Sequence, residues 1–120
     1  MKIEGEGKLL RVFVGESDKH GSKPLYQAIV ELLRERGLAG ATVLRGVEGF
    51  GAHSRLHTAR ILRLSEDLPM VIECVDRSER IDEVLPLLDE MVEEGMVTVE
   101  RVEVISYRAG EGETGDGESG

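Results

Sequence analysis

The chain has 120 residues, of which 40% are hydrophobic, and a formal net charge of -9 at pH 7. This length is typical of one domain with its own core, and the negative charge excludes general binding to nucleic acid or to anionic membranes. Aromatic residues make up only 3%, so the core must be aliphatic, and stacking platforms for single-stranded nucleic acid are excluded as well.

The first half of the chain predicts a strand, a helix and a second strand. Lys8–Gly15 is short, rich in β-formers and ended by glycine, which is typical of a strand. Ser22 is a suitable cap for a helix that begins near Pro24, and Gly37 is a natural stop. Ala41–Val47 is predicted to be the second strand. The helix is indicated by apolar residues at helical spacing, namely Leu25, Ile29, Leu32 and Leu33.

The second half predicts the same kinds of element again. Pro69–Asp76 is predicted to be a strand, and Asp76 with Glu79 resembles a capping box at the start of a second helix. Met96–Tyr107 is predicted to be the last strand, with a bulge near Glu100–Arg101 where its apolar alternation slips. The second helix is indicated by the apolar positions Ile81, Val84, Leu85, Leu88, Met91 and Val92.

This order of elements predicts an α+β fold, the ferredoxin-like βαββαβ sandwich. Right-handed crossovers place both helices on one face of a four-stranded antiparallel sheet. The first strand also carries Leu9 and Phe13 on the other face, and the third strand carries Val71 and Val75 there. A sheet that is apolar on both faces, with helices for only one, must be covered by association. The sequence therefore predicts an oligomer without fixing its number of subunits.

One domain and one tail are expected. Residues 1–108 form the domain, and residues 109–120 form a flexible acidic tail rich in Gly and Glu.

Cys74 is the only cysteine, so no intrachain disulfide forms, and its apolar surroundings predict a buried side chain. No apolar stretch is long enough to span a bilayer and the N-terminus lacks a signal core, so we expect a cytoplasmic protein.

The long connection between the second and third strands, residues 48–68, is the strongest candidate for function. From Arg45 to Arg63 there are four arginines against Glu48 alone. Guanidinium groups match phosphate and carboxylate oxygens, and nearby glycines let backbone amides approach an anion. The alternative is a surface loop whose arginines are simply solvated. The residues assigned to an anion-binding or partner-binding loop are Arg45, Arg55, His57, Arg60 and Arg63.

Several segments resemble PII nitrogen-signalling proteins. Gly40–Val43 followed by Glu48–Gly51 resembles their second strand and loop base, and Val104–Glu111 resembles their carboxy-terminal segment. The chain is also similar, over nearly all of Leu9–Tyr107, to a PII-like family of unknown function numbered one-ninety. The hallmarks of that family in this chain are Gly15–Asp18, Pro24–Leu25, Gly40–Gly46, Gly49–Ser54 and Leu64–Pro69.

The resemblance implies a homotrimeric signalling protein with an adenine nucleotide in the clefts between subunits. AMP or ADP is favoured over ATP, because the acidic Glu93–Met96 stands where PII proteins have a Gly/Lys-rich phosphate loop. Nucleotide would act through residues 48–68 on a partner, such as a membrane transporter or another regulated protein. No cofactor is implied. The residues implied to bind nucleotide are Thr42, Gly49, Phe50, Gly51, His53 and Arg108.

Two other functions stay open. One is a metal-binding trimer similar to the copper-tolerance proteins, with His53 and His57 plus Cys74 as its candidate ligands. The other is a subunit that docks on a partner without any ligand. Catalysis is not expected, because no nucleophile–base pair can be argued from the sequence.

Overall fold

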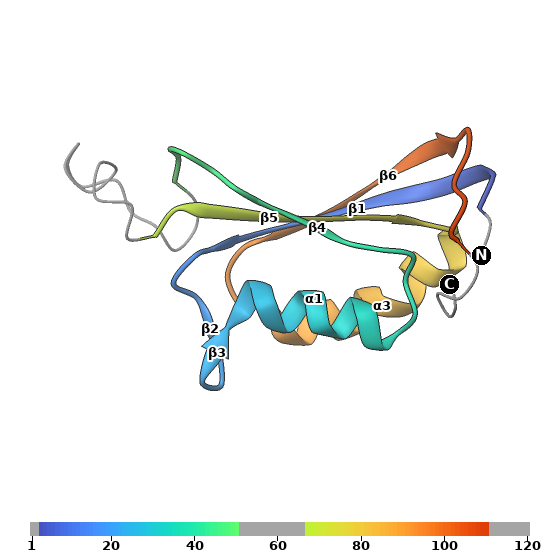
Figure 1. Ribbon diagram of the computed structural model, residues 1–120. Helices are drawn as coiled ribbons and strands as arrows, with labels where there is room; N and C mark the ends of the chain where they lie inside the picture. The colour runs from blue at the N-terminus through green and yellow to red at the C-terminus, as the bar shows by residue number, and fades with distance from the viewer. Residues whose placement is uncertain (1–2, 51–66, 111–120) are drawn as a thin grey trace.

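The computed structural model describes residues 3–50 and 67–110. In these residues a four-stranded antiparallel sheet is covered on one face by two helices, with a small two-stranded hairpin beside them (Figure 1). The strand order β4-β5-β1-β6 is that of the predicted ferredoxin-like α+β fold, which is thereby confirmed. The elements are β1 (Gly5–Gly15), β2 (Lys19–His20), β3 (Lys23–Pro24), α1 (Leu25–Glu35), β4 (Thr42–Arg45), β5 (Pro69–Asp76), α3 (Ser78–Met91) and β6 (Met96–Val104).

The core lies between the sheet and the helices and is aliphatic, as expected. Alternate residues of β1 and β5, such as Leu10 and Ile72, point toward the helices and are fully buried. They pack against Ile29 of α1 and against Ile81 and Leu88 of α3. In the described residues, no helix is both long and apolar enough to cross a membrane.

The pairing of β1 with β6 runs without interruption from Gly5 opposite Val104 to Phe13 opposite Met96. The predicted bulge near Glu100–Arg101 is therefore wrong. Because side chains alternate regularly along the strand, the valines of β6 change face instead. Those in its first half share the face of Leu10 and Val12, and those in its second half lie on the opposite face.

The start of α1 differs from the prediction. Ser22 does not cap the helix, which begins at Leu25 after an extended Pro24 (φ -59°, ψ 138°), with no side-chain cap. Lys23–Pro24 instead pairs with Lys19–His20 to form the β2–β3 hairpin. The backbone N–H of Leu25 donates to the carbonyl of Asp18 at 2.7 Å, so a backbone group takes part of the role expected of the serine.

The start of α3 also differs. The predicted capping box of Asp76 and Glu79 is wrong, because the helix follows Arg77 and no side chain caps it. Asp76 is the last residue of β5, and its side chain alternates onto the helix side, where it is fully buried. Its carboxylate accepts hydrogen bonds from the backbone N–H of Arg77 at 2.7 Å and of Ala39 at 2.8 Å.

Among residues 3–50 and 67–110, no element covers the sheet face away from the helices (Figure 1). Four apolar side chains lie next to one another across it: Leu44, Val71, Phe13 and Met96, here called the open-face row. At the two ends of this row, Leu44 is 47% exposed and Met96 is 58% exposed. The predicted two-sided apolar sheet is confirmed by this register.

Candidate functional site

The two ends of the long connection lie side by side at one end of the sheet. The backbone N–H of Gly46, just after β4, donates to the carbonyl of Pro69, the first residue of β5, at 2.8 Å. Gly49 has φ 154°, and a Cβ atom there would lie 3.0 Å from the Pro69 ring. A side chain at Gly49 would therefore be strained and crowded, which explains a glycine at this point.

One short turn contacts both of these ends. It is Gly15–Asp18, here called the β1 turn. The guanidinium group of Arg45 donates two hydrogen bonds to the carboxylate of Glu16, from Nε at 3.0 Å and from Nη2 at 3.1 Å. Asp67 Oδ1 accepts from the backbone N–H of Ser17 at 3.1 Å and from its hydroxyl at 2.8 Å. The turn thus links the end of β4 to the residues before β5.

The β1 turn is itself held by further hydrogen bonds. The backbone N–H of Gly15 donates to Asp18 Oδ2 at 2.9 Å, and that of Glu16 donates to the carbonyl of Leu68 at 2.8 Å. Sequence reasoning named this turn as a family hallmark but did not assign Glu16 or Asp67 a role. Opposite charge was the only signal in the sequence, and it does not single out Glu16 as the partner of Arg45, because Asp18, Glu66 and Asp67 also lie in the hallmark segments.

The described residues predicted to bind nucleotide do not come together within one subunit. Gly49 and Phe50 lie near Pro69 at one end of the sheet, and the Phe50 side chain is 66% exposed. Thr42 is exposed at the start of β4. Arg108 is exposed in the C-terminal segment after β6. The carbonyl of its neighbour Tyr107 accepts from the backbone N–H of Ile3, so this segment lies at the Gly5 end of β1, whereas the loop base lies at the Gly15 end.

The other residues predicted to bind nucleotide or to form the anion-binding or partner-binding loop lie outside the described residues. Their assigned roles therefore stay predictions, as does the flexibility of the tail over residues 111–120. The loop residues concerned are Gly51, His53, Arg55, His57, Arg60 and Arg63.

A mostly apolar cleft of about 300 Å³ lies beside Thr42, between the second half of α1 and the segment that leads to β4. Side chains from distant elements fix the backbone of that segment. Arg80 donates to the carbonyl of Gly37 at 2.7 Å, and the Tyr107 hydroxyl donates to the carbonyl of Ala39 at 3.3 Å. The cleft is lined by Val30, Leu33, Arg34, Leu38, Ala39, Gly40 and Ala41. Such a concave apolar surface suits a flat apolar group.

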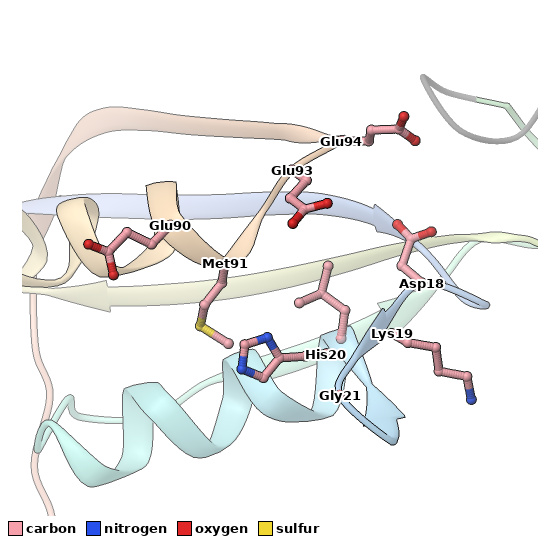
Figure 2. A pocket seen from close by; sticks show the side chains of 9 residues that line it. Asp18, Lys19, His20, Gly21, Glu90, Met91, Glu93 and Glu94 are labelled. Carbon is pink, nitrogen blue, oxygen red and sulfur yellow. The ribbon is translucent and has the colours of Figure 1, made fainter.

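A second cleft, of about 370 Å³, lies between the β2–β3 hairpin and the end of α3 (Figure 2). The carboxylates of Asp18 and Glu93 approach it from opposite sides, with His20 and Met91 nearby. Its acidic lining disfavours phosphate. Over residues 3–50 and 67–110, no group of three or more His, Cys, Asp and Glu side chains could hold a metal ion.

Cys74 is buried on the inner face of β5, as predicted. Burial, with a smaller effect from the charge of Asp76, raises the pKa of its thiol to about 11. A protonated, buried thiol is a poor nucleophile and a poor metal ligand. The candidate metal ligands His53 and His57 lie outside the described residues.

We expect the Cys74 thiol to resist labelling in the folded protein. At pH 8 its thiolate fraction is only about one in a thousand, so reaction with an aromatic disulfide reagent should be at least about 100-fold slower than in urea-unfolded protein. The raised pKa also predicts a stability contribution that is complete below about pH 9 and is lost as pH rises towards 11. Rapid stoichiometric labelling of native protein would contradict both expectations.

The sequence matches the model of the DUF190 family, "Uncharacterized ACR", over residues 7–104. A "UPF0166 protein" of Aquifex aeolicus (strain VF5) is 38% identical over 98 residues, which cover 82% of this chain and 92% of that relative. The "UPF0166 protein MJ1524" of Methanocaldococcus jannaschii is 39% identical over 87 residues, which cover 72% of this chain and 80% of that relative.

Similar solved structures belong to CPII from Thiomonas intermedia K12, described as a nitrogen regulatory PII-like protein. Its apo form has a TM-score of 0.59 at 16% identity, covering 90% of this chain and 100% of that one. CPII bound to ADP, AMP and acetate has a TM-score of 0.54 at 17% identity, covering 85% of this chain and 91% of that one. The fold described above is therefore PII-like.

Proposed function

Because the chain belongs to the DUF190 (UPF0166) family and has the PII-like fold, we propose that it is a regulatory binding protein and not an enzyme. In this proposal it is a homotrimer that binds an adenine nucleotide, AMP or ADP in preference to ATP, between its subunits. Occupancy is signalled through residues 48–68 to a partner, such as a membrane transporter or another regulated protein.

The observation that carries the proposal is the separation of the candidate nucleotide residues. Gly49 and Phe50 lie at the Pro69 end of the sheet, whereas Arg108 follows Tyr107, which pairs with Ile3 at the other end. A neighbouring subunit can supply the missing half, and the uncovered open-face row gives subunits a reason to associate. The CPII structures described as bound to ADP and AMP support an adenine nucleotide as the ligand.

The chemistry of the described residues suits the parts of such a ligand. The exposed ring of Phe50 and the apolar cleft beside Thr42 can contact a base, and the Thr42 hydroxyl can donate or accept a hydrogen bond. Arg108 can form charge-assisted hydrogen bonds to phosphate oxygens. The acidic segment with Glu93 and Glu94 favours a ligand with few phosphates, because added negative charge would be repelled.

Calorimetry with AMP, ADP and ATP tests the nucleotide part of this proposal, and native mass spectrometry tests the trimer. We expect saturable binding of AMP or ADP, weaker binding of ATP, and a mass of three subunits. The absence of saturable heat with all three nucleotides would exclude the nucleotide function.

Arg108→Ala is expected to weaken ADP affinity by about tenfold or more, because a charge-assisted hydrogen bond to phosphate is lost. Titration calorimetry measures the change. Arg101→Ala is the matched control, since Arg101 is an exposed arginine of β6 that has no proposed ligand role. Equal affinity of Arg108→Ala and the unmodified protein would remove Arg108 from the site.

A further inference from the structure

We propose that Glu16 is an internal competitor for the anion-binding side chain of Arg45. In the structure its carboxylate occupies the Nε and Nη2 donors on one edge of the guanidinium, an edge to which a phosphate group can also make two hydrogen bonds. A phosphate that binds this edge of Arg45 must displace Glu16, and one that binds the remaining Nη donors is repelled by the nearby carboxylate, so Glu16 lowers the affinity of this end of the sheet for anions. The identity of the physiological anion rests on the function proposed above, whereas the competition applies to any polyphosphate.

The ion pair of Arg45 and Glu16 has a geometry in which another anion can replace Glu16. The Arg45 and Glu16 side chains are joined by two hydrogen bonds of 3.0 and 3.1 Å, yet they remain 52% and 29% exposed. Exposed ion pairs contribute little to stability, because water and salt screen them. A ligand with two or more negative charges can therefore take over the guanidinium without first opening the protein core.

Glu16 is presented to Arg45 by a fixed support. The backbone N–H of Glu16 donates to Leu68, and both polar groups of Ser17 donate to Asp67. These bonds are independent of the Glu16 side chain, so the β1 turn can keep its place while Arg45 changes partner. The backbone hydrogen bonds of the β1 turn thus position the Glu16 carboxylate next to the guanidinium.

The surroundings of Arg45 suit an anion with an apolar part. Residues 46–50 follow it directly, and they end in the exposed ring of Phe50. Arg45 is the only Lys or Arg among residues 42–50. In this part of the described chain, its pairing with Glu16 therefore decides whether a positive charge is available to a ligand. A molecule with phosphate and a ring, such as a nucleotide, would use both features.

The test is a double-mutant cycle on anion binding, with inorganic pyrophosphate and ADP as probes. Glu16→Gln should tighten the binding of both probes by about two- to fivefold, since the competing charge is gone and an exposed ion pair is weak. Arg45→Gln should weaken binding, and the double variant should bind as weakly as Arg45→Gln alone. Glu83→Gln, at an exposed position of α3, makes the same charge change elsewhere and should have less effect than Glu16→Gln.

Two outcomes overturn the competition. One is a Glu16→Gln affinity equal to that of Glu83→Gln. The other is a gain from Glu16→Gln that persists in the Arg45→Gln background, since the effect would then come from general charge. As a second readout, the Nε–H NMR signal of Arg45, assigned by its loss in Arg45→Gln, should shift when pyrophosphate is added to the unmodified protein.

The probes separate this inference from the proposed function. If AMP and ADP bind no better than pyrophosphate, and Glu16→Gln still tightens pyrophosphate binding, the nucleotide function fails and the competition stands. If ADP binds and Glu16→Gln leaves its affinity unchanged, the competition fails and the nucleotide function stands. If no probe binds any variant, both are overturned.

Discussion

Replacing both Leu44 and Met96 by lysine is expected to convert a trimer into monomers, weakening association by more than about 100-fold. Both residues lie at the ends of the open-face row, on strands β4 and β6 at opposite edges of the sheet. Each loses about 0.8–1.5 kcal/mol of apolar burial if that face is covered by another subunit, which is half the value for a side chain buried from full exposure. Each lysine also adds an ammonium group whose desolvation costs more unless it is paired.

The same substitutions should leave the subunit folded, because about half of each side chain is already exposed in it. Sedimentation velocity measures association, and circular dichroism measures folding. The control variant combines Gln27→Lys with Glu83→Gln, which adds the same positive charge on the helix layer. An unmodified protein that is monomeric in dilute solution, or a double-lysine variant that stays trimeric, would show that this face is not the subunit contact.

A charged strip beside the open-face row limits how subunits can pack. On the same face, Arg11 lies between Glu73, at 2.8 Å from its Nε, and Glu100, at 3.1 Å from its Nη1. The hydrogen bond that Arg11 donates to Glu73 raises the pKa of Arg11 above its already high ordinary value, so this arginine stays charged. Because Arg11 pairs with both carboxylates within one subunit, the group has a net charge of -1, and a neighbour that covers this face has to accommodate that charge.

The sequence predicted well those features that repeat along the chain. The alternation of apolar residues in Pro69–Asp76 identified β5 with its observed bounds and showed that both faces of the sheet are apolar. Gly37 was identified as the end of α1, and its φ of 78° is one that glycine adopts readily. These features depend on local pattern and on backbone conformation, which neighbouring residues determine.

The features that failed depend on contacts from distant residues. Ser22 and the pair of Asp76 with Glu79 have the chemistry of caps, but the chain satisfies those helix ends in other ways. The contact between Arg45 and Glu16 joins residues 29 positions apart. It exists because β1 and β4 both pair with β5, which brings their ends together. No local pattern reports such a contact, so the sequence could name the loop base but not its partner.

Asp76→Ala is expected to lower the free energy of unfolding by about 2–4 kcal/mol. The carboxylate is fully buried and accepts from two backbone N–H groups, those of Ala39 and Arg77. Its removal leaves both N–H donors without this acceptor. Each buried donor that water does not reach then lowers the free energy of unfolding by about 1–3 kcal/mol. The bond to Ala39 also fixes the segment that leads to Thr42, so nucleotide affinity should fall as well. Urea unfolding at one protein concentration measures the stability loss.

Asp76→Asn and Asp82→Ala show which property of Asp76 matters. Asparagine keeps one acceptor oxygen but turns an NH₂ group toward one of the two backbone donors. The stability lost in Asp76→Asn should therefore approach that lost in Asp76→Ala. Asp82 forms an exposed ion pair with Lys8 at 2.7 Å, and its removal should cost less than about 1 kcal/mol. If Asp76→Ala were no less stable than Asp82→Ala, the buried carboxylate would not be what ties the end of α1 to the end of β5. The position of Thr42 would then need another cause.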